Sequence, residues 1–419
     1  MVDNKQISIP YVKDRESHNP INMFALSISV ILLTITFITF SVRNSKQPNK
    51  IFNVYSQPGR WFTLKYYVLR CTLMLRRLKY YFMDKSNFFQ PKQLEQLQPL
   101  SEHELAFDAV FFHFVSQDGI YYCSGIERRQ EGKCSGLIYL VLPEYGVFCN
   151  EKMPSTILDA DPESLFSMEY FGAEGISFKP LEPMKKWHVS YKGKMKQESN
   201  PQNILDVELE GIWYSDYPWI LFEVDSPAHV LATSFALEEW SKKYFQKLKE
   251  THQSHYEQMG FFSGKLKVNG KYYELDNLDA FRDHSFGHKR DWTIMHRYIY
   301  HMFYLKDGTK ISVGVISQPC TSSNLMVGYV AHPNKKVDMI DDCDLKLYQH
   351  GENGTLPTEL CFTVTANHKT YELQVKYLLE SIHYKGRARE AKMHERFHKC
   401  IVNGVSGRGI SEWHYNNKQ

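Results

Sequence analysis

The chain has 419 residues, enough for one large or two ordinary domains with a sizeable core. Its net charge of +3 is too small to favour nucleic acid as a partner, and its eight cysteines include no C-x-x-C pair, which argues against a zinc finger or a disulfide scaffold. Aromatic residues are abundant, with 27 Tyr and 26 Phe, and they favour strands and apolar pockets over coiled coil or disorder.

A polar tail of residues 1–22 precedes an uncharged run, residues 23–42. At ~1.5 Å per residue this run would span ~30 Å, so we expect a transmembrane helix, with a buried helix of a soluble domain as the alternative. No small-x-small cleavage site follows, which favours an uncleaved anchor over a signal peptide. All charged residues between the run and Asp84 are basic. The positive-inside rule therefore predicts a single-pass protein whose C-terminal part is cytoplasmic. A glycosylation sequon at Asn353 disagrees, because it would matter only in the lumen.

Residues 43–100 form a basic juxtamembrane segment. Within it, residues 60–83 mix basic with bulky apolar side chains, and the apolar ones fall near helical spacing. Such a helix could lie on anionic lipid, with its basic side chains extending toward water and the lipid head groups. Alternatively, it could dock on the protein core through the same stripe. The stripe contains Trp61, Leu64, Val68, Leu75, Leu78 and Phe82.

Strand patterns begin near residue 105. AFDAVFFHFV and IYYCSGIE flank Asp118-Gly119 and predict a hairpin, and residues 205–214 alternate apolar with acidic side chains as a half-buried strand does. One long helix is expected at residues 236–258, with an apolar stripe that includes Trp240 and with Gly260 placed to end it. We assign residues 101–258 to a first β lobe that includes this helix.

Two further hairpins are predicted in residues 259–419, which we assign to a second β lobe. Asn269-Gly270 and Asp307-Gly308 are both suited to type I′ turns between strands. Many short strands with glycine turns indicate a mainly β architecture, an antiparallel barrel or sandwich. The two turns frame a polar cluster in residues 281–319, which we therefore expect on a strand edge or a strand-entry loop.

This cluster contains the candidate site. Asp283 beside His284 is a candidate catalytic pair, because an imidazole oriented by a carboxylate is a common proton shuttle. Adjacent strand residues face apart, so Asp291 or Glu412 could be the partner of His284 instead. A structural polar network that ties the hairpins together is the alternative. The candidate ligand-binding residues are Arg282, Arg290, Asp291, Trp292, His296 and Glu412.

Metal and nucleotide signatures are weak or missing. The spacing of His284, His288, His296 and His301 fits no tetrahedral site. Residues 394–398 match H-E-x-x-H, but a third zinc ligand is missing at any known spacing, and the following Asn403-Gly404 turn suits a strand. The chain also has no P-loop, dinucleotide loop or G-x-S-x-G motif. We therefore expect no metal and no cofactor.

Three blocks of the chain carry a family resemblance. Residues 282–287 (RDHSFG), the following Arg290-Asp291-Trp292 and the pattern Gly407-x-Gly409-x-x-Glu412 resemble the carotenoid hydratase-like (AttH-like) lipocalin superfamily. The resemblance implies tandem lipocalin-like β-barrels and a family that includes hydratases, pericyclases and lipid carriers. It also singles out Arg282, Asp283, His284, Gly287, Arg290, Asp291, Trp292 and Glu412.

A closer resemblance links the chain to the N-terminal region of animal phosphoenolpyruvate synthase-like proteins. It rests on residues 182–195, on HYEQMG at 255–260, on RDHSFG and on VNGVSGRGISEW near the C-terminus. In those proteins an ATP-grasp domain and a phosphohistidine domain follow, and this chain stops before either. The resemblance therefore implies no phosphotransferase activity for this chain, although it leaves a separate phosphotransferase as a conceivable partner.

The leading hypothesis combines these features: a membrane-anchored, tandem lipocalin-like protein that binds a hydrophobic or amphiphilic, lipid-like ligand. The alternatives are an enzyme on the same fold, hydrating or isomerising an unsaturated lipid, and a non-catalytic partner of a phosphotransferase. In the enzyme, His284 or Asp283 would transfer protons and Arg282 or Arg290 would orient a polar head.

Overall fold

The computed structural model describes residues 48–417, which belong to one compact unit. The expected tail at residues 1–22 and the expected transmembrane helix at residues 23–42 lie outside the described residues. Between residues 48 and 417, every helix is too short or too polar to cross a bilayer.

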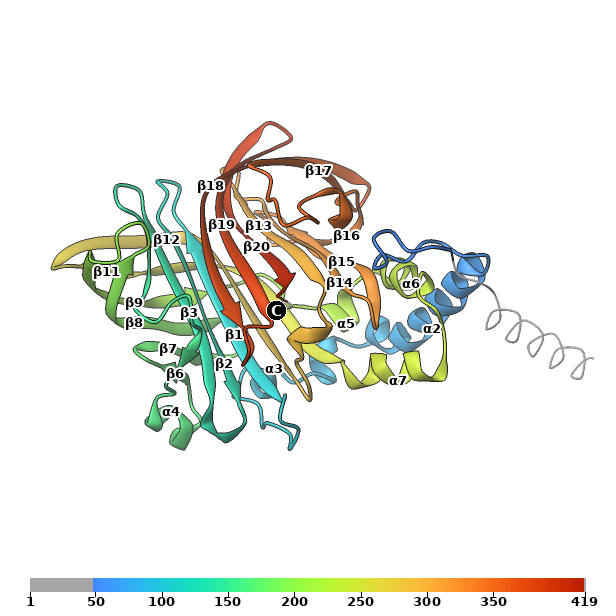
Figure 1. Cartoon of the computed structure of the whole chain (residues 1–419), viewed down its shortest axis with the longest axis horizontal. Coiled ribbons are helices and arrows are strands. Elements are labelled where there is room, and N and C mark those ends of the chain that lie inside the picture. The colour runs from blue at the N-terminus through green and yellow to red at the C-terminus, as the bar shows by residue number, and fades with distance from the viewer. Residues whose placement is uncertain (1–47, 418–419) are drawn as a thin grey trace, which may run out of the picture. The chain divides into compact units, whose positions relative to one another are not determined.

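Twelve strands form a first antiparallel sheet (Figure 1). They are β1 (Phe107–Val115), β2 (Tyr121–Arg129), β3 (Cys134–Leu142), β4 (Gly146–Asn150), β5 (Ile157–Leu158), β6 (Phe171–Ala173), β7 (Ile176–Glu182), β8 (Lys186–Gln197), β9 (Ile204–Tyr214), β10 (Ile220–Leu221), β11 (Gln253–Val268) and β12 (Lys271–Gly287). Their main order is β10-β11-β12-β1-β2-β3-β4-β8-β7-β6. Because β9 pairs with both β8 and β11, eight of the strands close into a ring around an apolar core. We call this ring the first barrel.

The second sheet is a closed barrel in strict chain order, which we call the second barrel. Its strands are β13 (Arg297–Leu305), β14 (Lys310–Gln318), β15 (Ser322–Ala331), β16 (Val337–Cys343), β17 (Glu359–Ala366), β18 (Lys369–Lys385), β19 (Ala391–Val402) and β20 (Val405–Asn416). The expectation of a mainly β chain with two antiparallel sheets is thus confirmed.

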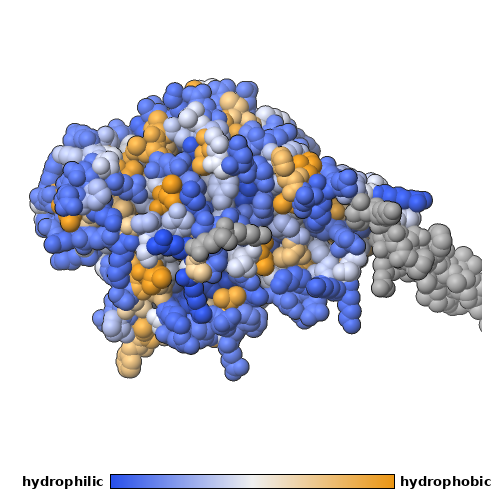
Figure 2. Space-filling model, viewed as in Figure 1, coloured by the Kyte–Doolittle hydropathy of each residue, from blue (hydrophilic) through white to orange (hydrophobic). Residues whose placement is uncertain are grey.

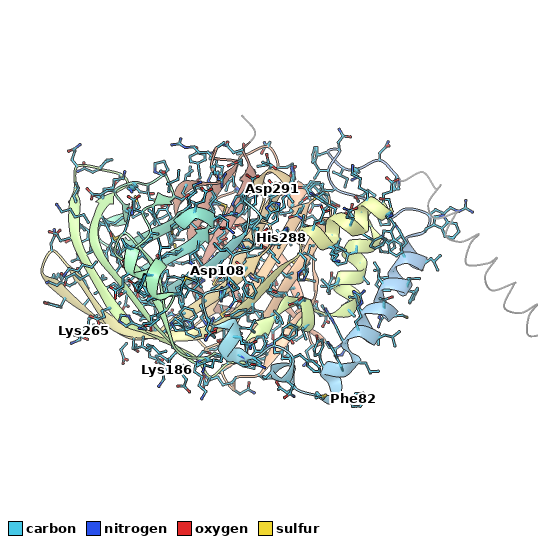
Figure 3. All side chains as sticks on the ribbon, turned by 90° about the horizontal axis from the view of Figure 1, so that it is seen from below. Phe82, Asp108, Lys186, Lys265, His288 and Asp291 are labelled. Atoms are coloured by element: carbon cyan, nitrogen blue, oxygen red, sulfur yellow. The ribbon has the colours of Figure 1, made fainter. Side chains whose placement is uncertain are left out.

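Several helices accompany the strands, in place of the one long helix expected. They are α2 (Phe62–Phe82), α3 (Pro91–Leu94), α4 (Pro162–Ser167), α5 (Phe222–Asp225), α6 (Ala228–Ala236) and α7 (Lys242–Glu250). The helix predicted at residues 60–83 is therefore confirmed as α2, and it packs along α6 (Figures 1 and 3).

The helix predicted at residues 236–258 is wrong at both ends. The Ser241 side chain accepts a hydrogen bond from Tyr244 N and starts α7 there, and the chain enters β11 at Gln253. Pairing with β12 outweighs the local helical pattern of residues 253–258. Gly260 ends no helix; a Cβ at this position would lie 2.6 Å from the Trp213 ring, so close packing requires glycine.

The three predicted hairpins are confirmed. Asn269 and Gly270 both have positive φ, 46° and 86°, as a type I′ turn between β11 and β12 requires. The Asp307-Gly308 turn differs from expectation, because only Gly308 has positive φ and Leu305 N donates to Thr309 O across a longer loop. The predicted alternation at residues 205–214 is confirmed in β9.

Three apolar layers organise the described chain. One fills the first barrel, one fills the second barrel, and the third lies between them, with Phe111 and Phe281 of the first barrel close to Met302 and Phe397 of the second. Polar side chains cover most of the face shown in Figure 2. RDHSFG lies in β12, between β1 and β11, and so belongs to the first sheet and not to a second lobe beginning at residue 259.

Candidate active site

A cavity of about 340 Å³ opens into the layer between the barrels. Strands β1, β2, β11 and β12 supply one wall, and β13, β14, β15 and β20 supply the other. Much of the lining is apolar, including Phe111, Phe281 and Met302. Ionisable residues also line it, among them His255, Glu257, Asp283, Arg290, Lys385 and Glu412.

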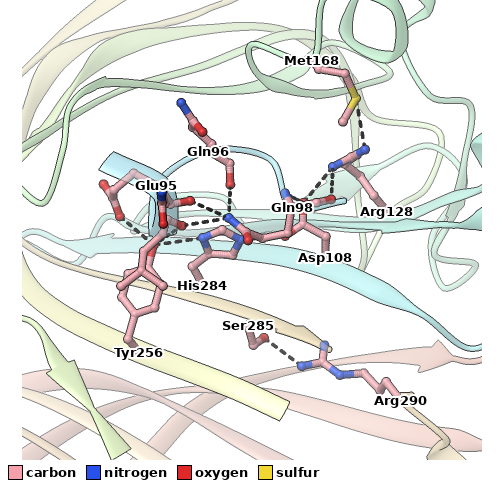
Figure 4. A network of polar contacts seen from close by, with 12 residues as sticks. Glu95, Gln96, Gln98, Asp108, Arg128, Met168, Tyr256, His284, Ser285 and Arg290 are labelled. Carbon is pink, nitrogen blue, oxygen red and sulfur yellow. Dashed lines mark hydrogen bonds and ion pairs between the residues drawn. The ribbon is translucent and has the colours of Figure 1, made fainter. Parts of the chain in front are cut away.

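The alternation of β12 divides the RDHSFG block between two environments. Arg282 and His284 are fully buried and point into the first barrel, whereas Asp283 and Ser285 line the cavity. Figure 4 shows this division: His284 faces Asp108 and Tyr256, and Ser285 faces Arg290 on the other side of the strand. One sequence motif therefore serves two sites.

Inside the first barrel, the polar groups are tightly paired. The Arg282 guanidinium lies 2.9 Å from the Glu95 carboxylate and stacks among aromatic rings, with its centre 4.9 Å from the Trp213 ring. His284 Nε2 lies 2.6 Å from Asp108 Oδ1, and its Nδ1 lies 2.9 Å from the Tyr256 hydroxyl. The carboxylate that orients His284 is therefore Asp108, and neither Asp291 nor Glu412 has that role.

On the cavity side, two carboxyl groups face each other across neighbouring strands. Glu257 of β11 is the register partner of Asp283, so their side chains project from adjacent positions on one face. Glu257 accepts hydrogen bonds from the Tyr300 hydroxyl and from Ser312 Oγ (2.9 Å), and lies 3.0 Å from His255 Nε2. Within residues 48–417, the Asp283 carboxyl group receives no hydrogen bond. The two acids thus have very different surroundings.

These surroundings shift the ionisation of both Asp283 and His255. Burial, together with the charges of Glu257 and Glu412, raises the pKa of Asp283 to about 6 against the opposing charges of His255 and Arg290. Burial lowers the pKa of His255, but the hydrogen bond to Glu257 and the charge of Asp283 outweigh it, so the pKa ends above its usual value. The raised pKa of Asp283 favours its carboxylic acid form up to about pH 6, and the raised pKa of His255 favours its imidazolium form.

A second carboxyl pair continues the site on β19 and β20. Glu412 accepts a hydrogen bond of 3.0 Å from Tyr298, and burial raises the pKa of Glu412. Its register partner Glu395 is fully buried, and neither of its carboxyl oxygens has a hydrogen-bond partner within residues 48–417; burial raises the pKa of Glu395 well above its usual range. Glu395 is therefore held in its neutral form beside the cavity wall.

Arg290 is fixed at another edge of the cavity. It donates to Glu127 at 2.9 Å, to Ser285 at 2.8 Å and to Gln253 at 3.1 Å. Burial raises the pKa of Glu127, but the charges of Arg129, Arg290 and Lys385 lower it more, to about 2. Next to Arg290, Asp291 accepts a hydrogen bond from Thr293 N and lies 3.4 Å from Lys289.

The predicted site residues are partly brought together. Asp283, Arg290, Asp291, Trp292 and Glu412 line the cavity. Arg282 and His284 point away from it, and His296 lies 2.8 Å from Glu352 in a separate cluster with Tyr55. The cavity residues that sequence reasoning missed are His255, Glu257, Tyr298, Tyr300 and Lys385.

A signal for two of the missed residues exists in the sequence. His255 and Glu257 stand two residues apart in HYEQMG, which places them on one face of a strand. Assigning this segment to a helix concealed that relation. Tyr298 and Tyr300 also stand two residues apart on one strand, but their approach to the cavity, like that of Lys385, depends on how the second barrel closes.

The H-E-x-x-H sequence lies on β19 and not on a helix. At ~3.3 Å per residue, His394 and His398 are ~13 Å apart along the strand, too far to share one zinc ion. His394 instead lies 2.8 Å from Glu380. Within residues 48–417, no cluster of three or more potential metal ligands is found.

Comparisons with known proteins were made for sequence and for fold. A family profile described as "family of unknown function (DUF8627)" matches residues 27–415. No curated protein sequence matches the chain, so the resemblance to phosphoenolpyruvate synthase-like proteins gains no support.

Among solved structures, a candidate AttH protein of Nitrosomonas europaea is similar, with 13% identity and a TM-score of 0.49 over 75% of this chain and 94% of that one. Kievitone hydratase of Nectria haematococca matches with 12% identity and a TM-score of 0.48 over 77% and 92% of the two chains. CghA in complex with Sch210972 matches with 8% identity and a TM-score of 0.44 over 75% and 90%.

Proposed function

We propose that this chain, which belongs to the family of unknown function DUF8627, is an enzyme that moves protons on an unsaturated, largely apolar small molecule. The reaction class is isomerisation or hydration of a carbon–carbon double bond. The observation that carries this proposal is the pair of opposed carboxyl groups, Asp283 and Glu257, whose surroundings differ so strongly. Two carboxyl groups in different surroundings can act as general acid and general base in one site.

The roles follow from the hydrogen bonds. Asp283, which receives none and whose pKa is about 6, is the proton donor to a substrate carbon or carbonyl oxygen. Glu257 is held as the base by Tyr300, Ser312 and His255. In an isomerisation, the base removes an allylic proton as Asp283 delivers one, and in a hydration it removes the proton of the attacking water. Either reaction leaves Glu257 protonated and Asp283 deprotonated, and transfer of one proton from Glu257 to Asp283 through solvent then restores both groups without a cofactor.

The cavity walls suit an apolar substrate of modest size. A volume of about 340 Å³ is at the lower end of the range of ~300–1,000 Å³ that is common for small-molecule sites. Aromatic and aliphatic side chains such as Phe111, Phe281 and Met302 supply contact area. The low-dielectric surroundings also strengthen the electrostatic effect of each carboxyl group on the bound substrate.

The test uses solvent isotopes, which report proton transfer before a natural substrate is known. The full chain is incubated with a panel of conjugated enones and dienes in D₂O, and separately in H₂¹⁸O, and the products are analysed by mass spectrometry. We expect deuterium at carbon, with ¹⁸O incorporation added if hydration occurs. Asp283→Asn should abolish the label, whereas the control Asp276→Asn, at an exposed position of the same strand, should retain it. Label retained in Asp283→Asn would contradict the proposal.

A carrier of an amphiphilic ligand is the second candidate, favoured by the apolar lining of the cavity. The same panel separates the two functions. A carrier would take up a compound and return it with no isotope incorporated by wild type, and Asp283→Asn would bind it as well as wild type does.

A further inference from the structure

We propose that Lys385 and Trp292 form a subsite for a carboxylate group on the cavity ligand. This inference deepens the proposed function and rests on the same cavity being the ligand site. Both residues line the cavity, and the Lys385 ammonium lies 5.7 Å from the centre of the Trp292 ring.

The first observation is an imbalance among the three cations that line the cavity. Lys289 is paired with Asp291 at 3.4 Å, and Arg290 is paired with Glu127 at 2.9 Å. Within residues 48–417, Lys385 forms neither an ion pair nor a side-chain hydrogen bond. Its charge nevertheless lowers the pKa of Glu127 and opposes the rise at Glu412 and Glu395, which places it close to all three carboxyl groups without contacting them.

The second observation is an unused donor beside this lysine. The Trp292 indole Nε1 is buried and has no hydrogen-bond acceptor within residues 48–417. A buried donor without an acceptor is costly, and indole nitrogens normally find one. An anionic oxygen placed between Nζ of Lys385 and Nε1 of Trp292 would satisfy both groups.

The charge balance favours a carboxylate over a phosphate. One ammonium without a counterion matches a single negative charge, and a dianion would add repulsion from Glu412 and Asp283 in the same cavity. The subsite therefore defines the substrate class more closely as an unsaturated carboxylic acid.

The experiment compares one acid with its ester. Binding of 5-phenylpenta-2,4-dienoic acid and of its methyl ester to the full chain is measured by isothermal titration calorimetry at pH 7.5. We expect wild type to prefer the acid by about tenfold or more, as a charge-assisted hydrogen bond provides. Lys385→Met should remove the preference by weakening acid binding alone. Lys376→Met, at an exposed position of β18, is the matched control and should retain it.

The outcomes separate this subsite from the proposed reaction. Lys385→Arg should keep the acid preference, which distinguishes a charge effect from misfolding. Equal binding of acid and ester by wild type, an unchanged preference in Lys385→Met, or no binding of either compound would overturn the subsite. Acid preference without isotope incorporation would instead contradict the enzyme and leave the subsite standing.

A separate observation concerns helix α2, whose two long faces are both apolar. One face, with half-buried Phe62, Tyr66, Leu69 and Leu73, packs along α6, and Lys65 on that side is buried and donates to Glu238 O. The opposite face is exposed; we call it the outer stripe, and it contains Tyr67 (56% exposed), Val68, Cys71, Met74, Leu75 (72%), Leu78 and Phe82. Phe82 lies at the edge of the molecule in Figure 3. Of the stripe for which both lipid contact and core docking were considered, Val68, Leu75, Leu78 and Phe82 thus face outward.

We infer that the outer stripe rests on an anionic lipid surface. Exposed basic side chains, Arg70, Arg76 and Lys79, accompany the stripe, and α2 contains no acidic residue. Apolar side chains at i, i+4, i+7 and i+11 with basic residues at their flanks are the pattern of an interfacial helix. Each basic residue near an anionic leaflet adds electrostatic attraction, which an uncharged or basic protein partner would not supply.

Two exposed cysteines allow a local test on the full chain. Cys71 lies within the outer stripe and Cys361 lies on β17. In a protein with Cys361→Ser and Cys320→Ser, an environment-sensitive fluorophore labels Cys71. In a protein with Cys71→Ser and Cys320→Ser, the same fluorophore labels Cys361. Vesicles of phosphatidylcholine with and without phosphatidylserine are added. We expect a blue shift and quenching by a lipid-borne quencher at residue 71, strongest with phosphatidylserine, and no change at residue 361.

Three results would overturn the lipid contact. One is unchanged fluorescence of the label at residue 71 while the protein floats with the vesicles, which would mean that another segment binds the lipid. Another is a label that is already blue-shifted without vesicles, which would mean that protein covers the stripe. The third is failure of the protein to bind vesicles at all.

Discussion

The two faces of β12 present alternate residues of one motif to opposite environments. On the inner face, both ring nitrogens of His284 are hydrogen-bonded, to Asp108 and Tyr256, and one nitrogen of Arg282 pairs with Glu95. On the outer face, Asp283 has no side-chain hydrogen bond within residues 48–417 and lies beside another acid. A paired buried imidazole stabilises a fold, whereas an acid with an unused hydrogen-bonding capacity in a cavity can bind or protonate a ligand. We therefore expect the buried histidine to be structural and take Asp283 as the functional candidate.

The largest expected effect is on turnover at the outer face. Asp283→Asn keeps the shape of the side chain but removes its exchangeable acid proton, so we expect isotope incorporation to fall by about 10²- to 10⁴-fold. Circular dichroism should show an unchanged fold. A rate within error of the Asp276→Asn control would remove the distinction between the faces.

On the inner face the largest effect should be on stability. Arg282→Met leaves Glu95 buried without its cation, and we expect the free energy of unfolding to drop by about 3 kcal/mol. Urea unfolding measures this, with Lys271→Met at an exposed position of β12 as control. Turnover per folded molecule should stay the same. Lost turnover with unchanged stability would mean that the roles of the two faces are reversed.

The ionisation of Asp283 predicts a pH dependence of stability. Its pKa of about 6 in the folded chain exceeds its usual value of 3.8. The stability that protonated Asp283 contributes is therefore complete below about pH 4 and is lost as the pH rises through 6. Asp283→Asn should unfold with a free energy on the order of 1–2 kcal/mol higher than wild type at pH 8. The difference should vanish near pH 4, and equal gains at both values would refute the shift.

The smallest effect is expected from the hydrogen bonds that hold Glu257. Tyr300→Phe removes one donor, so we expect a loss of about 1 kcal/mol in the free energy of unfolding. Because Glu257 then loses one of the donors that position its carboxyl group, the rate of isotope incorporation should also fall. Tyr272→Phe, exposed on β12, should change neither quantity, and an unchanged rate in Tyr300→Phe would show that Tyr300 does not position the base.

Local patterns predicted much of the secondary structure. The alternation of β9 and the turns at Asp118-Gly119 and Asn269-Gly270 were recognisable because each depends only on neighbouring residues. The helix expected at residues 236–258 was wrong because β12 recruits residues 253–258 into a sheet. No local rule shows that a remote strand will compete for a segment.

The candidate site was predictable only as a neighbourhood. The sequence indicated a site in residues 282–292. It also showed that Asp283 and His284 must face apart, because strand side chains alternate. It could not show which face of the strand would point into the core of the first barrel. That depended on Glu95 and Asp108, far away in the chain, closing around Arg282 and His284.

The sequence by itself thus determined the β character, the principal turns and the division of one motif between two faces, since these follow from periods of two and from backbone geometry. Only the tertiary structure decided which carboxyl groups meet. Glu257, Asp283 and Glu412 come from three strands of two barrels, and the raised pKa of Asp283 and Glu412 depends on burial in a shared cavity that no stretch of sequence encodes alone.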